Sequence, residues 1–340
     1  MFGSDLRKME KGREINGETQ VLATVKPTLY PQEVPPKVAP ASEGFRWHSL
    51  SRIETPMVAL DFVIPGFSKC GTTTLCELLC QHPQIAIPRK EPGYFAQHFG
   101  EGPGWYGALF EGVPAGVLRG DASTTYSTEQ FGDVASIRLA TRFPHLKCIF
   151  IARHPLRRLE SSFRQMHHMG HLFGVSAERD IAATLTKLPN MIADTRYWSL
   201  INRYRRFFSD QQIHVVLLED FARQPVAEVR RCFSFLGLDP NVPLTDVTRR
   251  SNSGETKEYD TAAMRFIRSR QLLRSLWNRL PPARRDSLAR RLGLRRPFSQ
   301  TVEWTPATVS LLRQSLAEDS EQLLAYAGRS PAFWLWPEAA

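Results

Sequence analysis

An apolar segment that runs into a loop with two glycines constrains the fold more than any other part of the chain. Residues 62–75 are typical of a buried β-strand, a glycine loop and the start of a helix. Gly66 and Gly71 have the spacing of a nucleoside triphosphate-binding loop, but Thr72 occupies the usual lysine position and Lys69 lies inside the loop. Because loop N–H groups and a helix N-terminus attract anions, the segment predicts a nucleotide-phosphate site unlike that of an ATP or GTP hydrolase.

A second apolar segment ends in an arginine-rich turn. Residues 147–152 are predicted to form a strand, and Arg153, Pro155 and Arg158 follow before Ser161 on the next helix. An arginine offers a planar fork of donors to a phosphate, and a serine hydroxyl adds one further hydrogen bond. This segment therefore predicts a second anion site.

In order and separation, the two segments resemble the 5′-phosphosulfate loop (G-x-x-K-x-G-T-T) and the 3′-phosphate motif of sulfotransferases that use 3′-phosphoadenosine 5′-phosphosulfate (PAPS). The resemblance covers residues 57–240 well and the last hundred residues loosely. It implies PAPS as sulfuryl donor, 3′-phosphoadenosine 5′-phosphate (PAP) as product, and a 3′-phosphate held by Arg153 and Ser161, with Arg158 as the motif's second arginine. The implied donor-binding loop residues are Gly66, Lys69, Cys70, Gly71, Thr72, Thr73 and Thr74.

Residues 90–95 carry the predicted base. They resemble the K-E-x-x-F-F segment of carbohydrate sulfotransferases of the heparan sulfate type, whose glutamate is the base, so Glu91 is the implied base and His98 the alternative. The implied reaction is in-line transfer to a hydroxyl, or alternatively an amine, of a carbohydrate-like or glycosylated small molecule. Lys69 is expected to stabilise charge on the leaving phosphate. A kinase-like phosphotransferase and a catalytically silent PAPS-binding module are the alternatives.

Several further residues are weaker candidates. Residues 120–126 resemble a cleft-lining stretch of the carbohydrate enzymes, although Ala122 stands where many of those enzymes carry a lysine. The candidate acceptor contacts are Tyr94, Phe95, Asp121, Ser123, His167 and His168, of which the aromatic residues can equally be core and Asp121 and Ser123 can equally cap a turn. Tyr197, Arg250 and Ser253 are candidates for the donor pocket. No metal is expected.

Alternating strands and helices predict an α/β protein with a P-loop-like three-layer fold. Its central, mostly parallel sheet is expected to be flanked by helices and followed by a helical C-terminal extension. Residues 1–55 are expected to be a flexible, proline-containing arm, and 56–340 a single domain with a donor-binding core (57–240) and a basic helical part (241–340). Strands are predicted near 58–64, 115–119, 147–152 and 213–218, and helices near 72–81, 130–142, 155–168, 197–208, 225–236 and 306–326.

The charge is concentrated in one segment. Of a net charge of +10, residues 249–296 hold 14 Lys or Arg against 4 Asp or Glu. An electrostatic lip for the substrates, a membrane-surface helix, a nucleic-acid patch and a solvated helix face all remain open. Nucleic acid is not expected, and membrane contact is not favoured. Five cysteines without a C-x-x-C pair, and no apparent signal segment, predict a cytoplasmic protein. The oligomeric state stays open.

Overall fold

The computed structural model describes residues 58–169, 177–178, 180–247, 258–297 and 302–337. The predicted N-terminal arm and the candidates Arg250 and Ser253 lie outside these residues. Within them, no helix is both long and apolar enough to cross a lipid bilayer.

A five-stranded sheet in the order β2-β3-β1-β4-β5 forms the centre of the molecule. Every pairing in it is parallel, so all five strands end at the same edge. The middle strands are apolar on both faces, as a sheet covered by helices on both sides requires. The strands are β1 (Phe62–Gly66), β2 (Ile85–Ala86), β3 (Leu118–Asp121), β4 (Lys147–Ala152) and β5 (Ile213–Leu217).

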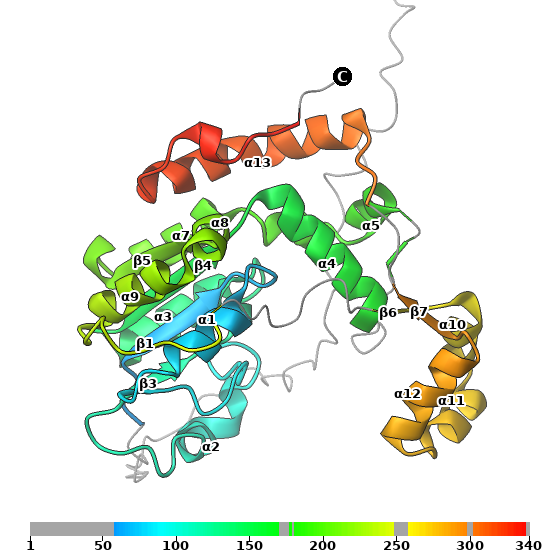
Figure 1. Ribbon diagram of the computed structural model, residues 1–340, viewed down its shortest axis with the longest axis horizontal. Coiled ribbons are helices and arrows are strands. Elements are labelled where there is room, and N and C mark those ends of the chain that lie inside the picture. Colours follow the sequence, from blue (N-terminus) through cyan, green and yellow to red (C-terminus); the bar gives the residue numbers. More distant parts are fainter. Residues whose placement is uncertain (1–57, 170–176, 179, 248–257, 298–301, 338–340) are drawn as a thin grey trace, which may run out of the picture.

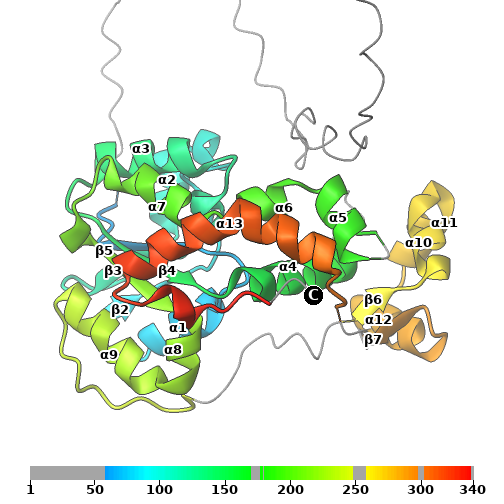
Figure 2. The same cartoon turned by 90° about the horizontal axis from the view of Figure 1, so that it is seen from above.

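Helices pack on both faces of this sheet, which confirms the predicted three-layer α/β fold (Figure 2). One layer contains α3, α7 and α13, and the other contains α1, α8 and α9. The helices are α1 (Thr72–Leu79), α2 (Gly102–Ala108), α3 (Gly132–Arg142), α4 (Pro155–Met169), α5 (Ile181–Lys187), α6 (Asn190–Ala193), α7 (Tyr197–Arg205), α8 (Leu218–Arg223), α9 (Pro225–Leu236) and α13 (Pro306–Tyr326), with short 3-10 turns η2 (Phe99–Glu101), η3 (Thr124–Ser127), η5 (Asp210–Gln212) and η7 (Pro331–Phe333).

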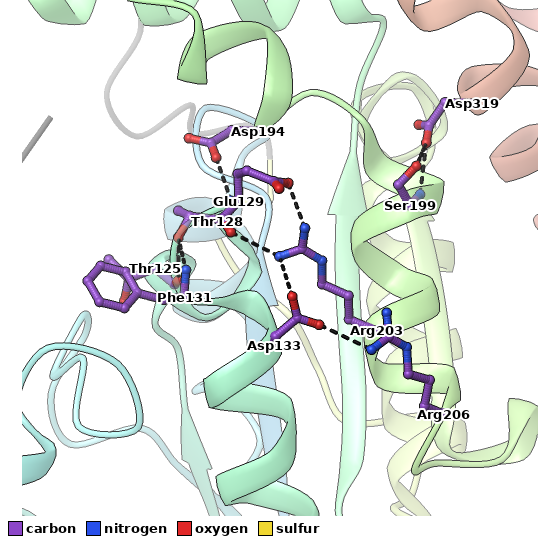
Figure 3. A network of polar contacts seen from close by, with 10 residues as sticks. All are labelled: Thr125, Thr128, Glu129, Phe131, Asp133, Asp194, Ser199, Arg203, Arg206 and Asp319. Atoms are coloured by element: carbon purple, nitrogen blue, oxygen red, sulfur yellow. Dashed lines mark hydrogen bonds and ion pairs between the residues drawn. The ribbon is translucent and has the colours of Figure 1, made fainter. Parts of the chain in front are cut away.

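Polar contacts hold the first helical layer together (Figure 3). Arg203 of α7 donates to the backbone oxygen of Glu129 at 3.0 Å and pairs with the carboxylates of Glu129 and Asp133, at the start of α3. Asp319 of α13 accepts from the N–H and hydroxyl groups of Ser199, at the start of α7. The three helices are thereby fixed to one another and to the segment that follows β3.

A smaller unit of residues 258–297 projects from the end of α4 (Figure 1). It consists of β6 (Glu258–Asp260), α10 (Ala262–Ser269), α11 (Gln271–Asn278), α12 (Pro282–Arg291) and β7 (Arg295–Pro297). β6 and β7 pair antiparallel, so two short strands, which were not predicted, accompany the helices of the predicted C-terminal extension. Strands of three residues are too short to show an alternating pattern in the sequence.

The helices and strands predicted for the core agree with the observed ones in type, but less closely in where they begin and end. The expected strand at 58–64 begins at Phe62 and extends to Gly66, and the one at 115–119 begins at Leu118. The helix predicted at 306–326 has those bounds, since Thr305 caps it and Pro306 occupies its first position. The sequence interpretation missed β2, α2, α5, α6 and α8, all of eight residues or fewer.

Candidate active site

The loop between β1 and α1 has the shape of an anion cradle. Lys69 and Gly71 both adopt a positive φ (71° and 96°), which turns the backbone into the start of α1. A Cβ at Gly66 would collide with the hydroxyl of Ser127, and one at Gly71 would lie 2.8 Å from Leu218. A side chain at either position would displace these neighbours, and the positive φ of Gly71 additionally favours glycine there.

The N-terminus of α1 faces this loop without a protein cap. Gly71 is the N-cap residue and supplies no side-chain hydrogen bond to the first turn. Thr72 is buried, whereas Thr73 and Thr74 are partly exposed. The first-turn N–H groups and the positive end of the helix are thus suited to an anion.

Arg153 lies directly after β4, beside the loop. Its Nη1 donates to the backbone oxygen of Lys69 at 3.3 Å. Its Nε is buried and has no hydrogen-bond partner among the described residues. An unsatisfied, buried guanidinium N–H is costly, so this atom fits a bound phosphate oxygen.

One face of α4 runs past the same loop. Arg158, Ser161 and Gln165 share this face because they are three and four residues apart. Gln165 accepts a hydrogen bond from Lys69 Nζ at 3.2 Å. Ser161 is partly exposed between the two, where its hydroxyl can join Arg153 in holding a phosphate.

Arg158 is buried and its donors are used within the protein. It donates to the backbone oxygens of Ser68 (3.2 Å) and Met191 (3.0 Å) and to the hydroxyl of Thr195 (2.8 Å). The guanidinium therefore supports the backbone of the loop, and its contact with the donor stays a prediction. Arg158 joins the loop to α6 and the start of α7.

Tyr197 and Cys70 are also buried behind the loop. The Tyr197 hydroxyl donates to the backbone oxygen of Arg153 at 3.0 Å and lies 3.6 Å from Cys70 Sγ. Burial raises the pKa of the Cys70 thiol, so it is not an acidic, reactive cysteine. Both side chains are fully buried, so they support the loop from behind, and their contact with the donor stays a prediction.

Glu91 lies at the same carboxyl edge, next to β3. Its N–H donates to the backbone oxygen of Ala122 at 2.8 Å, and its φ of 58° turns the chain away from the sheet. The carboxylate pairs with Lys90 at 2.8 Å and accepts from the N–H of Thr124 at 2.8 Å. The side chain is 39% exposed, so an acceptor can reach it.

His98, the alternative base, lies further along this segment. Its imidazole is exposed and packs against Trp105, with ring centroids 5.7 Å apart. Its backbone N–H donates to the oxygen of Gly93 at 3.2 Å, whereas the backbone of Glu91 is bonded to Ala122, directly after β3. Glu91 therefore lies nearer to the carboxyl end of β3 than His98, and the identity of the base stays a prediction.

Four of the predicted acceptor contacts form a buried group beneath Glu91. Asp121 accepts from the hydroxyls of Tyr106 (2.9 Å), Tyr126 (2.7 Å) and Ser123 (2.7 Å), and burial raises its pKa to about 6. Ser123 in turn accepts from the N–H of Gly93 at 3.0 Å. Asp121, Ser123, Tyr94 and Phe95 are at most 1% exposed, so here they are part of the core, and their contact with the acceptor stays a prediction.

The remaining candidates lie at the end of α4. His167 and His168 are partly exposed, and the His167 ring packs edge-on against Phe163 with centroids 4.6 Å apart. His168 follows Ser161 and Gln165 along one side of the helix, while His167 packs toward the smaller apolar cluster. Across the described ranges, no three His, Cys, Asp or Glu side chains gather closely enough to hold a metal ion.

Two residues beside the candidate site were not identified from the sequence. Gln165 accepts a hydrogen bond from the loop lysine, and Glu219, in the first turn of α8, accepts from the N–H of His154 (2.8 Å) and from Trp334 Nε1 (3.1 Å). Trp334 is 2% exposed and belongs to the core. Each of these three hydrogen bonds joins residues more than 60 positions apart, so no local pattern reveals them.

Comparison with known proteins identifies the family. Residues 60–275 match the family described as the sulfotransferase domain, and the chain belongs to it. Membership of the sulfotransferase family agrees with the observed parallel sheet and with the anion-binding loop at its carboxyl edge.

Individual relatives are distant. The chain is 25% identical over 214 residues to the bifunctional heparan sulfate N-deacetylase/N-sulfotransferase 1 of Caenorhabditis briggsae (57% of this chain, 24% of the relative). It is 24% identical over 195 residues to human heparan sulfate glucosamine 3-O-sulfotransferase 5 (53% of this chain, 54% of the relative). It thus spans about a quarter to a half of these relatives' lengths. A sulfotransferase structure from Alicyclobacillus acidocaldarius has a TM-score of 0.57 at 23% identity, covering 82% of this chain and 99% of that one, which shows the shared fold.

Proposed function

We propose that this protein is a PAPS-dependent sulfotransferase that transfers a sulfuryl group to a hydroxyl or amine of a carbohydrate-like acceptor. The observation that carries the proposal is the position of Lys69, Arg153 and Glu91. Lys69 follows β1, Arg153 follows β4, and Glu91 lies next to the end of β3. These strands are neighbours in one parallel sheet, so the three residues lie at the same carboxyl edge.

The residues of the loop and of α4 fit a donor with phosphates at two positions. PAPS supplies the sulfuryl group when it is bound. Arg153 Nε and the Ser161 hydroxyl would hold its 3′-phosphate, and the first-turn N–H groups of α1, with Thr73 and Thr74, would hold its 5′ end. Lys69 Nζ, which now donates to Gln165, would instead donate to the oxygen between the 5′-phosphate and the sulfuryl group. There it would stabilise the negative charge that develops during transfer.

Glu91 is proposed to accept the proton of the attacking acceptor. Its carboxylate is accessible, and Lys90 and the Thr124 N–H fix its orientation. The buried Asp121 and Ser123 support the turn at Gly93, so the backbone that carries Glu91 is rigid. Orientation of a base toward its proton is a large part of general-base catalysis.

A saccharide acceptor is favoured because two of these relatives carry heparan sulfate in their names. The Glu91 segment also resembles that of carbohydrate sulfotransferases. The partly exposed ring of Trp105, which lies near Tyr94 and Arg89, is suited to stacking on a sugar. A cytoplasmic location stays a prediction from the five unpaired cysteines.

The test is transfer from PAPS to a panel of amino sugars and desulfated heparan fragments, followed by mass spectrometry. Glu91→Gln keeps the size of the side chain, and Glu111→Gln, at an exposed position, is the matched control. We expect Glu91→Gln to lose transfer by about 100-fold or more while PAP affinity is unchanged. Full activity in Glu91→Gln, with loss in His98→Ala, would assign the base to His98. No transfer by the wild type to any acceptor, despite PAP binding, would favour the silent module.

A further inference from the structure

The unit of residues 258–297, here called the basic module, differs from the rest of the protein in charge. Between its first and last residues the sequence has 11 arginines and 3 carboxylates. Arg295 pairs with Asp286 at 3.4 Å, but three carboxylates cannot neutralise eleven arginines. Arg270, Arg279 and Arg284 are exposed. The module therefore carries a strong positive charge. It lies at one end of the molecule (Figure 1).

Helix α11 of the module turns its apolar side to solvent. Leu272, Leu273 and Leu276 lie on one side of the helix and are 80%, 38% and 57% exposed. The opposite side carries Gln271, Ser275 and Asn278. An amphipathic helix of a globular protein normally buries its apolar stripe, so this one lacks the usual covering.

Exposed apolar side chains gather in the module. Among the described residues ten large hydrophobic side chains are exposed, and six of them are in this unit of 40 residues. Besides the three leucines of α11 they are Phe266 (55%), Leu288 (36%) and Leu292 (61%). Such a concentration marks an interaction surface rather than scattered exposure.

The combination of apolar and cationic groups selects the partner. A nucleic acid or a sulfated glycan would pair with the arginines but would leave the leucines in water. The interface of an anionic lipid bilayer satisfies both groups, since acyl chains accept the leucines and the headgroups attract the arginines.

We propose that the basic module binds the surface of anionic membranes, with α11 lying in the plane of the interface and its leucines inserted. β6 packs against α4, so binding would hold the sheet domain, with the carboxyl edge, beside the bilayer. The proposal concerns a surface outside the donor site and does not depend on the proposed reaction.

The experiment is co-sedimentation of the full chain with vesicles of phosphatidylcholine alone or with about one third phosphatidylserine. We expect binding to the anionic vesicles that weakens as salt rises, and little binding to neutral ones. Arg270→Gln/Arg279→Gln should lower partition about tenfold or more, at about fivefold per arginine.

The leucines give the decisive variant. Leu272→Ser/Leu276→Ser keeps all charges and should lower partition to anionic vesicles at least about tenfold. Leu311→Ser and Arg313→Gln, both at exposed positions of α13, are the matched controls and should bind like wild type. Circular dichroism and urea denaturation check that each variant is folded.

Three results would overturn the proposal. The first is that the wild type does not bind anionic vesicles. The second is that the folded Leu272→Ser/Leu276→Ser variant binds them as well as the wild type does. The third is that heparin or an oligonucleotide binds more tightly than vesicles and displaces the protein from them, equally in the wild type and in the leucine variant. The last two would assign the module to a polyanion. None of them bears on sulfuryl transfer, which is measured separately with a soluble acceptor.

Discussion

Replacement of the buried carboxylate Asp121 by asparagine should change how the stability of this protein depends on pH. Asp121 is fully buried and accepts three hydroxyl hydrogen bonds. In Asp121→Asn the amide oxygen can still accept from Tyr106 and Tyr126, and its NH₂ group can donate to Ser123. The variant therefore resembles the protonated wild type in shape and in hydrogen bonding.

The magnitude follows from the pKa of Asp121, which burial raises from an ordinary value of 3.8 to about 6. Because the folded protein holds this proton more tightly than the unfolded chain, the carboxyl contributes stability in full below pH 3.8, and the contribution is lost as pH rises through about 6. The whole contribution is about 3 kcal/mol at 1.36 kcal/mol per pKa unit, of which about 2 kcal/mol falls between pH 4.5 and 7.5.

The assay is urea denaturation of wild type and Asp121→Asn at pH 4.5 and 7.5. Other titrating groups are shared, so the wild type should lose about 2 kcal/mol more than the variant between the two conditions. Equal losses would refute the reasoning, since they would mean that Asp121 titrates alike in the folded and unfolded chains.

Two further predictions concern the loop. Lys69→Met should lower turnover about 100-fold or more and change PAP affinity little, because its charge acts on the transition state; a steady-state comparison with direct PAP titration separates the two effects, and normal turnover would remove Lys69 from catalysis. Arg158→Met should lower the free energy of unfolding by about 2–4 kcal/mol, because the carbonyls of Ser68 and Met191 lose their buried donor, and urea denaturation would show it; a stability equal to wild type would contradict the supporting role.

The sequence predicted those parts of the fold and site that local patterns encode. Long apolar strands such as 147–152, and helices with a capping residue and proline such as 306–326, were predicted within a few residues. Because both motifs are contiguous in the sequence, the glycine loop indicated that Lys69 follows a strand. The arginine turn indicated that Arg153 and Ser161 lie after a second apolar strand. Parallel strand order then brings them to one edge.

Side-chain burial could not be predicted in the same way. Arg158, Tyr197 and Asp121 are polar residues within or near motifs, yet their partners come from segments far away in the sequence, such as Met191 and Tyr106. A polar side chain in a motif can bind a ligand or support the backbone that does so. Only the tertiary contacts distinguish the two roles.

The exposure of the leucines in the basic module could not be predicted from the sequence either. Their helical spacing predicts an amphipathic helix, which ordinarily packs onto a core. The structure instead attaches the module through β6, so that α11 remains uncovered.

The central claim is that the carboxyl edge of the sheet holds a 3′-phosphorylated nucleotide through Arg153. Calorimetric titration of the protein with PAP and with ADP, without added metal, tests it most directly, with wild type and Arg153→Ala side by side. We expect a strong preference of the wild type for PAP, and a loss of about 1.5–3 kcal/mol of PAP binding in Arg153→Ala that leaves ADP binding unchanged. Equal affinity of the wild type for PAP and ADP, or binding that requires magnesium, would contradict the account.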